Sequence, residues 1–125
     1  MNLNQVTVRV KDIEKSIIFY ELLGLRLIVK SPHYARFECP DGDATFSISL
    51  SDVQNSNING TVIYFEILNL DEKVSQLIDK GIEFDMLPTD QRYLWREAIL
   101  RDPDNNSIKL YFAGDNRKNP PWKVT

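Results

Sequence analysis

The chain carries one pattern twice, and this repeat limits the folds that are open to it. The stretch QVTVRVKDIEKS, residues 5–16, recurs as VIYFEILNLDEK, residues 62–73. In each copy alternating apolar residues, typical of a strand, lead to a small polar residue and then to an amphipathic helix pattern. Asp12 and Asn69 stand at the expected helix N-caps, and Gly24 and Gly81 stand where a left-handed residue would end each helix. We therefore predict two copies of one structural unit.

Each copy continues with further strand patterns around a turn. HYARFEC and ATFSISLS flank CPDGDA in the first half, and YLWREAILR and SIKLYF flank DPDNNS in the second. Pro-Asp followed by Gly or Asn favours a tight turn. We predict an α+β fold, with two tandem βαβββ modules forming a cup-shaped, largely antiparallel sheet whose helices lie on the outer face. One domain of 125 residues is expected, with module 1 at about 3–51, a linker at 52–60, module 2 at about 61–113 and a C-terminal tail at 114–125.

Composition excludes several classes of partner. The net charge is −3 with no basic stripe, which argues against nucleic acid. No apolar run approaches the length of a membrane span, and the N-terminus has no signal-peptide pattern. Cys39 is the single cysteine, so no internal disulfide can form. We expect a cytoplasmic protein with no membrane partner.

Strand parity predicts one apolar and one polar face in each module. In the first strand Val8 and Val10 alternate with Thr7 and Arg9. The apolar faces should meet helix stripes, which in the second helix would be formed by Val74, Leu77 and Ile78. The opposite faces are polar but carry few charges, so we interpret them as the walls of a binding cup.

Two segments carry a family resemblance. VTVRVKDIEKSIIFYELLGLRL and RDPDNNSIKLY resemble the strand–D-x-x-x-S-x-x-F-Y–LG opening and the D-P-D-G-N turn of the vicinal oxygen chelate superfamily. That superfamily includes glyoxalase I, extradiol dioxygenases, fosfomycin-resistance enzymes and bleomycin-binding proteins. The resemblance covers residues 3–113 and implies the fold predicted above. It does not specify a reaction, because this fold supports many chemistries.

The same resemblance implies four metal-ligand positions, one on each of four strands. They fall on Gln5, Ser49, Val62 and Lys109. Gln5 is an acceptable ligand, but the relatives carry a carboxylate, a histidine and a glutamate at the other three, and an ammonium group repels a divalent cation. His33 is the only histidine, which excludes a two-histidine iron site within one chain. We predict no metal and no cofactor.

The polar faces supply the candidate ligand-binding residues. Glu66 is the candidate general base, or a partner for a cationic ligand, although an ion pair with Arg9 or Lys109 would need no ligand. In the expected seventh strand, Tyr93, Trp95 and Glu97 share one parity. Trp95 is then a stacking surface for a ligand or an anchor at a dimer interface. The predicted ligand-binding set is Gln5, Arg9, Ser49, Tyr64, Glu66, Trp95, Lys109 and Tyr111.

Three functions follow from these features. The leading hypothesis is a metal-independent protein that binds a small organic molecule, as in the bleomycin-binding branch. A second is a metal-dependent lyase, isomerase or dioxygenase whose non-standard site uses Gln5 and Glu66. A third is a non-catalytic regulatory or interaction module whose cup is filled by its own side chains. The sequence does not decide whether any reaction is catalysed.

Aromatic residues without an assigned role suggest self-association. Tyr93, Leu94, Trp95 and Trp122 are more apolar surface than a monomer readily exposes. The tail with Pro120 and Pro121 is expected to run extended, with its tryptophan pinned over the cup or a partner subunit. We predict a symmetric homodimer.

Overall fold

The computed structural model describes residues 2–51 and 61–124. These residues form two compact units. Unit 1 comprises the described residues up to Ser51 together with Asp102–Asn106, and unit 2 comprises the described residues of 61–101 and 107–124. The predicted linker 52–60 lies outside the described residues.

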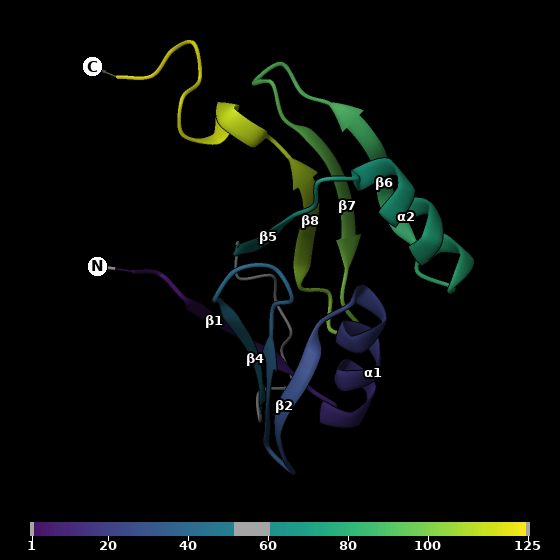
Figure 1. Cartoon of the computed structure of the whole chain (residues 1–125). Coiled ribbons are helices and arrows are strands. Elements are labelled where there is room, and N and C mark those ends of the chain that lie inside the picture. Colours follow the sequence, from purple (N-terminus) through teal and green to yellow (C-terminus); the bar gives the residue numbers. More distant parts are fainter. Residues whose placement is uncertain (1, 52–60, 125) are drawn as a thin grey trace. The chain divides into compact units, whose positions relative to one another are not determined.

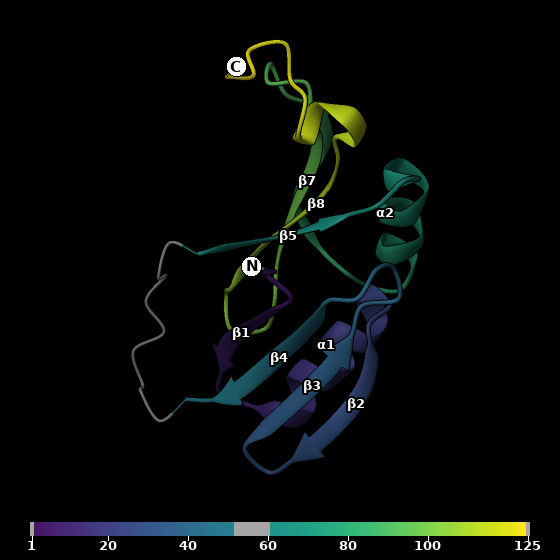
Figure 2. The same cartoon turned by 60° about the vertical axis from the view of Figure 1, so that its left-hand side comes forward.

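Unit 1 is a four-stranded mixed sheet with one helix on a face of it (Figures 1 and 2). Its elements are β1 (Gln5–Val10), α1 (Ile13–Leu23), β2 (Arg26–Ser31), β3 (Tyr34–Glu38) and β4 (Thr45–Leu50). The strand order is β1-β4-β3-β2, in which β1 runs parallel to β4 and the other two pairs are antiparallel. The βαβββ prediction is confirmed for this half.

The core of unit 1 lies between α1 and the sheet. Tyr20 is fully buried, and its ring centroid is 4.7 Å from that of Phe46 and 5.8 Å from that of Phe37. Helix α1 begins as predicted, because the Asp12 carboxylate accepts a hydrogen bond of 3.0 Å from the Lys15 amide. It ends at Gly24, whose φ of 109° is accessible to glycine at little cost.

A turn from the second half of the sequence completes unit 1. Tyr20 donates a 2.7 Å hydrogen bond to Oδ2 of Asp102, which is 4 % exposed. Oδ1 of Asp102 accepts from the amides of Asp104 and Asn106, and the Asn106 side chain donates to the Arg9 carbonyl. Burial, followed by the charge and hydrogen bond of Asp102, raises the pKa of Tyr20 far above its usual value. The DPDNN turn is therefore a structural element of this core.

Unit 2 repeats the architecture (Figure 1). Its elements are β5 (Val62–Glu66), α2 (Leu70–Asp79), β6 (Phe84–Asp90), β7 (Arg96–Arg101), β8 (Ser107–Phe112) and a short 3₁₀ helix, η1 (Gly114–Arg117). The order is β5-β8-β7-β6, with β5 parallel to β8. A bidentate ion pair joins the guanidinium of Arg96 on β7 to Asp71 on α2, with nitrogen–oxygen distances of 2.8 and 3.0 Å.

Two local predictions differ from the structure of unit 2. The Asn69 side chain makes no capping hydrogen bond and instead donates to Glu72. The buried stripe of α2 is Leu70, Val74 and Leu77, and Ile78 is 45 % exposed. Leu70, Val74 and Leu77 are spaced by four and then three residues, so they lie on the same side of the helix. Ile78 is one residue after Leu77 and therefore points about 100° away from that side.

The seventh strand and the tail also differ from expectation. Strand β7 begins at Arg96, and residues 91–95 form a turn in which Leu94 has a φ of 70°. The tail starts with η1, and Trp122 is 58 % exposed, so the described residues leave more than half of it accessible to solvent. No helix among the described residues is long and apolar enough to cross a membrane.

Candidate functional site

The polar face of the unit 2 sheet gathers aromatic rings around a buried ion pair. Arg96, Ala98 and Leu100 face α2, so Glu97 points to the opposite side of β7. Register places Glu97 opposite Tyr111 of β8, and Lys109 of β8 opposite Tyr64 of β5. We call this group the aromatic–carboxylate cluster; its members are Tyr64, Tyr93, Trp95, Glu97, Lys109 and Tyr111.

Glu97 is the centre of the cluster. It is 1 % exposed, and its Oε1 accepts a 2.8 Å hydrogen bond from the Tyr93 hydroxyl and lies 3.2 Å from Nζ of Lys109. Its Oε2 is buried and has no hydrogen-bond partner within the part of the chain that the structure describes. Such atoms are rare in folded proteins, because a buried polar atom without a partner loses its hydration and gains no hydrogen bond that compensates for it.

The ionisable neighbours of Glu97 respond to it. Burial alone would lower the pKa of Lys109, but hydrogen bonds to Glu97 and Tyr64 and the charge of Glu97 outweigh it, so the pKa is raised. Burial and then the hydrogen bond to Glu97 raise the pKa of Tyr93. Lysine therefore stays charged and tyrosine stays neutral at ordinary pH. The Lys109 ammonium also lies 5.3 Å from the centroid of the Tyr64 ring, in cation–π range.

Aromatic rings form the outer part of the cluster. Trp95 stacks on Tyr111 with centroids 4.7 Å apart, and it meets Tyr64 and Tyr93 edge-on at 5.9 Å each. Tyr111 is buried, whereas Tyr64 is 43 % exposed. The structure thus brings together four of the predicted ligand-binding residues: Tyr64, Trp95, Lys109 and Tyr111.

Glu66 lies in unit 2 with partners that the sequence did not indicate. Its Oε2 accepts hydrogen bonds of 2.9 Å from the amides of Ala113 and Gly114, and its Oε1 is 3.7 Å from Nε of Arg117. Lys109 pairs with Glu97 instead, so the alternative ion pair of Glu66 with Lys109 is wrong, and within unit 2 Arg117 of η1 is the cation beside Glu66. Both oxygens of Glu66 hold the start of the tail, so a role as general base would have to displace these contacts.

The remaining predicted residues lie on the polar face of unit 1. The carbonyl oxygen of the Gln5 side chain accepts a 2.7 Å hydrogen bond from the Thr45 hydroxyl. Arg9 stands opposite Ser49 in the pairing of β1 with β4. Within the described residues no group of three histidine, cysteine or acidic side chains could hold a metal ion.

Some members of these faces were not predicted as site residues. The predicted alternation grouped Glu97 and Tyr93 with Trp95, and the three do meet, although Tyr93 and Trp95 lie in a turn before β7. On unit 1, Tyr34, Arg36 and Ser47 form a hydrogen-bonded group. Alternation along β3 and β4 was the signal for this group, but contact between these side chains depends on the pairing of the two strands.

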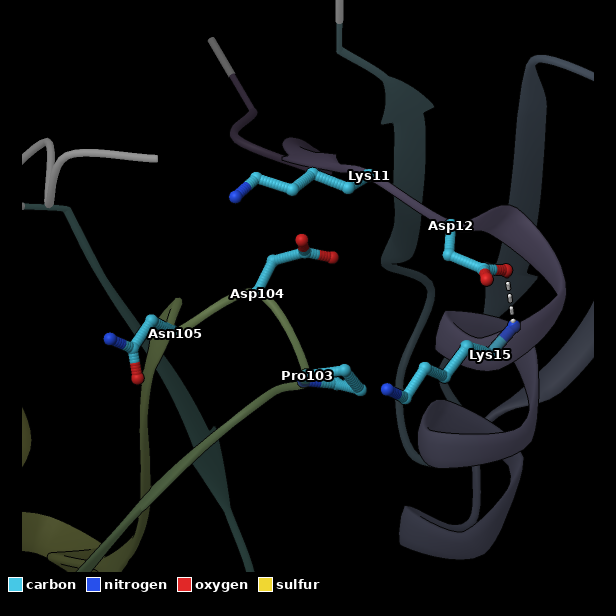
Figure 3. Close-up of a pocket in the computed structure, with 6 residues that line it drawn as sticks. All are labelled: Lys11, Asp12, Lys15, Pro103, Asp104 and Asn105. Carbon is cyan, nitrogen blue, oxygen red and sulfur yellow. Dashed lines mark hydrogen bonds between the residues drawn. The ribbon is translucent and has the colours of Figure 1, made fainter. Parts of the chain in front are cut away.

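A surface cavity of about 490 Å³ lies elsewhere on unit 1 (Figure 3). Lys11, Asp12 and Lys15 at the start of α1 face the loop residues 103–105 across it. Two lysines are balanced by Asp12 and Asp104, and the Asp12 side chain already caps the helix. The cavity therefore offers little beyond ordinary solvated surface.

Comparison with known proteins defines the class to which the chain belongs. The model of the Glyoxalase/Bleomycin resistance protein/Dioxygenase superfamily matches residues 2–110. The chain belongs to this superfamily, which confirms the resemblance noted in its sequence. A search of curated proteins found no match.

Solved structures agree on the fold. A glyoxalase/bleomycin resistance protein/dioxygenase from Nocardioides is 20 % identical, with 100 % of this chain and 90 % of that chain covered and a TM-score of 0.78. The bleomycin resistance determinant encoded on transposon Tn5 is 16 % identical, with 91 % and 99 % covered and a TM-score of 0.78. Lactoylglutathione lyase from Agrobacterium tumefaciens is 16 % identical, with 89 % and 92 % covered and a TM-score of 0.74. At these identities the likeness concerns the fold alone.

Proposed function

We propose that the chain is a cytosolic protein that binds a small organic molecule at the aromatic–carboxylate cluster and does so without the metal centre usual in its superfamily. The observation that carries this proposal is Oε2 of Glu97, a buried carboxylate oxygen with no hydrogen-bond partner among the described residues. A ligand N–H or O–H group that reached this oxygen would form a charge-assisted hydrogen bond and remove the cost of leaving it unmade.

The rings indicate the shape of the ligand. Trp95, Tyr64 and Tyr111 present aromatic surface beside the carboxylate, and stacking favours a planar group. Because Lys109 already neutralises Glu97, the ligand does not need a full positive charge. The expected ligand is a planar molecule with a hydrogen-bond donor, either neutral or weakly cationic.

The donor set argues against the usual metal. The Val62 side chain has no atom that can coordinate a cation, and Lys109 carries an ammonium group that its own neighbours hold charged. The alternative of a metal-dependent enzyme predicts about one equivalent of bound divalent metal per chain in protein purified without chelator. Less than a tenth of an equivalent in metal analysis is what we expect.

A non-catalytic interaction module remains a second candidate, favoured by one observation. The rings of Trp95, Tyr64 and Tyr111 contact one another, as they would if the cluster filled itself. We further propose a symmetric homodimer, supported by the exposure of Leu94 at 48 % and Trp122 at 58 %.

A thermal-shift screen tests the binding proposal. The panel contains benzamidine, neutral aromatic amides, bleomycin, and magnesium, manganese and zinc salts. A ligand at one hundred times its Kd should stabilise the fold by about 2.7 kcal/mol, which corresponds to a Tm rise of roughly 10 °C for a domain of this size.

Variants assign the binding to the cluster. Glu97→Gln keeps the shape but removes the charge, and it should weaken binding of any hit at least tenfold. Glu83→Gln, an equal change of charge at an exposed position of unit 2, is the matched control. Trp95→Phe is a milder second variant if Glu97→Gln fails to fold. Stabilisation by a divalent metal and by no organic compound would overturn the proposal.

A further inference from the structure

The polar face of the unit 1 sheet carries a linked group of hydroxyl and guanidinium side chains. Ala35 and Phe37 of β3 are fully buried towards α1, so Tyr34 and Arg36 point to the opposite face. There the Tyr34 hydroxyl lies 2.6 Å from the hydroxyl of buried Ser47. Nε of Arg36 donates a 2.9 Å hydrogen bond to the same Tyr34 hydroxyl. Arg36 is therefore held in place through its Nε atom.

Among the described residues, the other end of this guanidinium makes no hydrogen bond or ion pair. The carbon Cζ of Arg36 lies 5.4 Å from the centroid of the Tyr34 ring, so one hydrogen bond and one ring fix its position. Arg26 on the neighbouring strand pairs with Glu38 at 3.4 Å, but Arg36 has no carboxylate partner among the described residues. Its two terminal nitrogens present a positioned fork of N–H donors.

A second arginine shares this face. Arg9 alternates with buried Val8 and Val10 on β1, and the register places it opposite Ser49, which in turn stands opposite Tyr34. Two strand spacings, roughly 10 Å, therefore separate Arg9 from Tyr34. In the described part of the chain, Arg9 also lacks a carboxylate partner, and its side chain is exposed.

The charge of the face is one-sided. Among the polar-face residues of β1, β3 and β4, the one acidic side chain is Glu38, which Arg26 neutralises. Burial would raise the pKa of Tyr34, but the hydrogen bonds of Ser47 and Arg36 and the charge of Arg36 outweigh it and lower the pKa. The lack of an unpaired carboxylate and the lowered pKa of Tyr34 show that this face favours a negatively charged group, although the net charge of the chain is −3.

We propose that this face is an oxyanion-binding site, in which Arg36 and Arg9 hold the carboxylate or phosphate group of a small acidic ligand above Ser49. Arg36 supplies a charged hydrogen-bonding fork whose orientation is set by Tyr34, and Arg9 supplies a second, adjustable charge. The site uses residues separate from the aromatic–carboxylate cluster, so it stands or fails without the proposed function.

The test is an NMR titration of the ¹⁵N-labelled full chain with inorganic phosphate at constant ionic strength. Constant ionic strength is needed because surface charges are screened by any added salt. The variants are Arg36→Gln, Arg9→Gln and the control Arg92→Gln, which makes the same change of charge at an exposed position of unit 2. A parallel titration with acetate distinguishes a preference for carboxylate from one for phosphate.

We expect the amide signals of β3 and β4 to shift and to reach saturation as phosphate is added. The dissociation constant for phosphate of Arg36→Gln and of Arg9→Gln should be at least five times that of Arg92→Gln. Arg9→Gln keeps the test valid if loss of the Tyr34 contact unfolds the Arg36 variant, because the exposed Arg9 side chain makes no hydrogen bond or ion pair among the described residues. A smaller difference from Arg92→Gln, or shifts confined to other elements, would overturn the proposal.

Discussion

The hydrogen bond between Tyr20 and Asp102 gives a direct test of how the core of unit 1 is held together. Tyr20→Phe removes one hydroxyl and leaves the ring that packs on Phe37 and Phe46. Because Asp102 is 4 % exposed, water cannot readily replace the lost donor. The carboxylate would keep its bonds from the amides of Asp104 and Asn106 and from the Asn106 side chain.

The expected loss follows from the charge of the acceptor. A hydrogen bond to a charged group contributes roughly 1.5–3 kcal/mol, so we expect the free energy of unfolding to fall by about 2 kcal/mol. With an m value of about 2 kcal/mol/M, the urea midpoint should fall by about 1 M and m should not change. Circular dichroism during urea denaturation measures both quantities.

A second tyrosine provides the comparison. Tyr93 also donates to a buried carboxylate, at 2.8 Å, but the Lys109 ammonium lies 3.2 Å from the same oxygen of Glu97 and Tyr93 itself is 37 % exposed, so the loss of its hydroxyl is partly compensated. Tyr93→Phe should therefore cost under about 1 kcal/mol. If Tyr20→Phe costs less than about 0.5 kcal/mol, or no more than Tyr93→Phe, the buried bond does not have the role that we assign to it.

Three further predictions concern the tail, the ion pair and assembly. Glu66→Ala removes the acceptor of the Ala113 and Gly114 amides, so limited proteolysis should cut the tail several times faster than in the wild type. An unchanged rate of cleavage would show that Glu66 does not hold the start of the tail. The pKa of Lys109 is raised above its usual value, so its pair with Glu97 stabilises the fold at pH below about 10.5 and this contribution is lost as the pH rises through the folded-state pKa. In Lys109→Met, the urea midpoint of unfolding should fall less steeply with rising pH above about 10 than in the wild type. If the midpoints of the two proteins fall in parallel with pH, the pair does not stabilise the fold. Light scattering at micromolar concentration should give twice the chain mass of 14.5 kDa, and a monomer mass would remove the homodimer.

The sequence by itself determined the features that depend on near neighbours along the chain. The cap at Asp12, the left-handed glycines at 24 and 81 and the alternation of each strand are set within a few residues, so the βαβββ repeat was predictable. Alternation also placed Glu97 with Trp95, although the strand begins later than expected. The hydrogen-bond partners of these residues were not predictable. Glu66 accepts from amides 47 and 48 positions away along the chain, and Tyr20 donates to Asp102, which is 82 positions away. Burial of Glu97, the fixed guanidinium of Arg36 and the anchor of Glu66 arise from pairing between distant strands, and only the tertiary structure decides that pairing, because no local periodicity encodes which strands become neighbours.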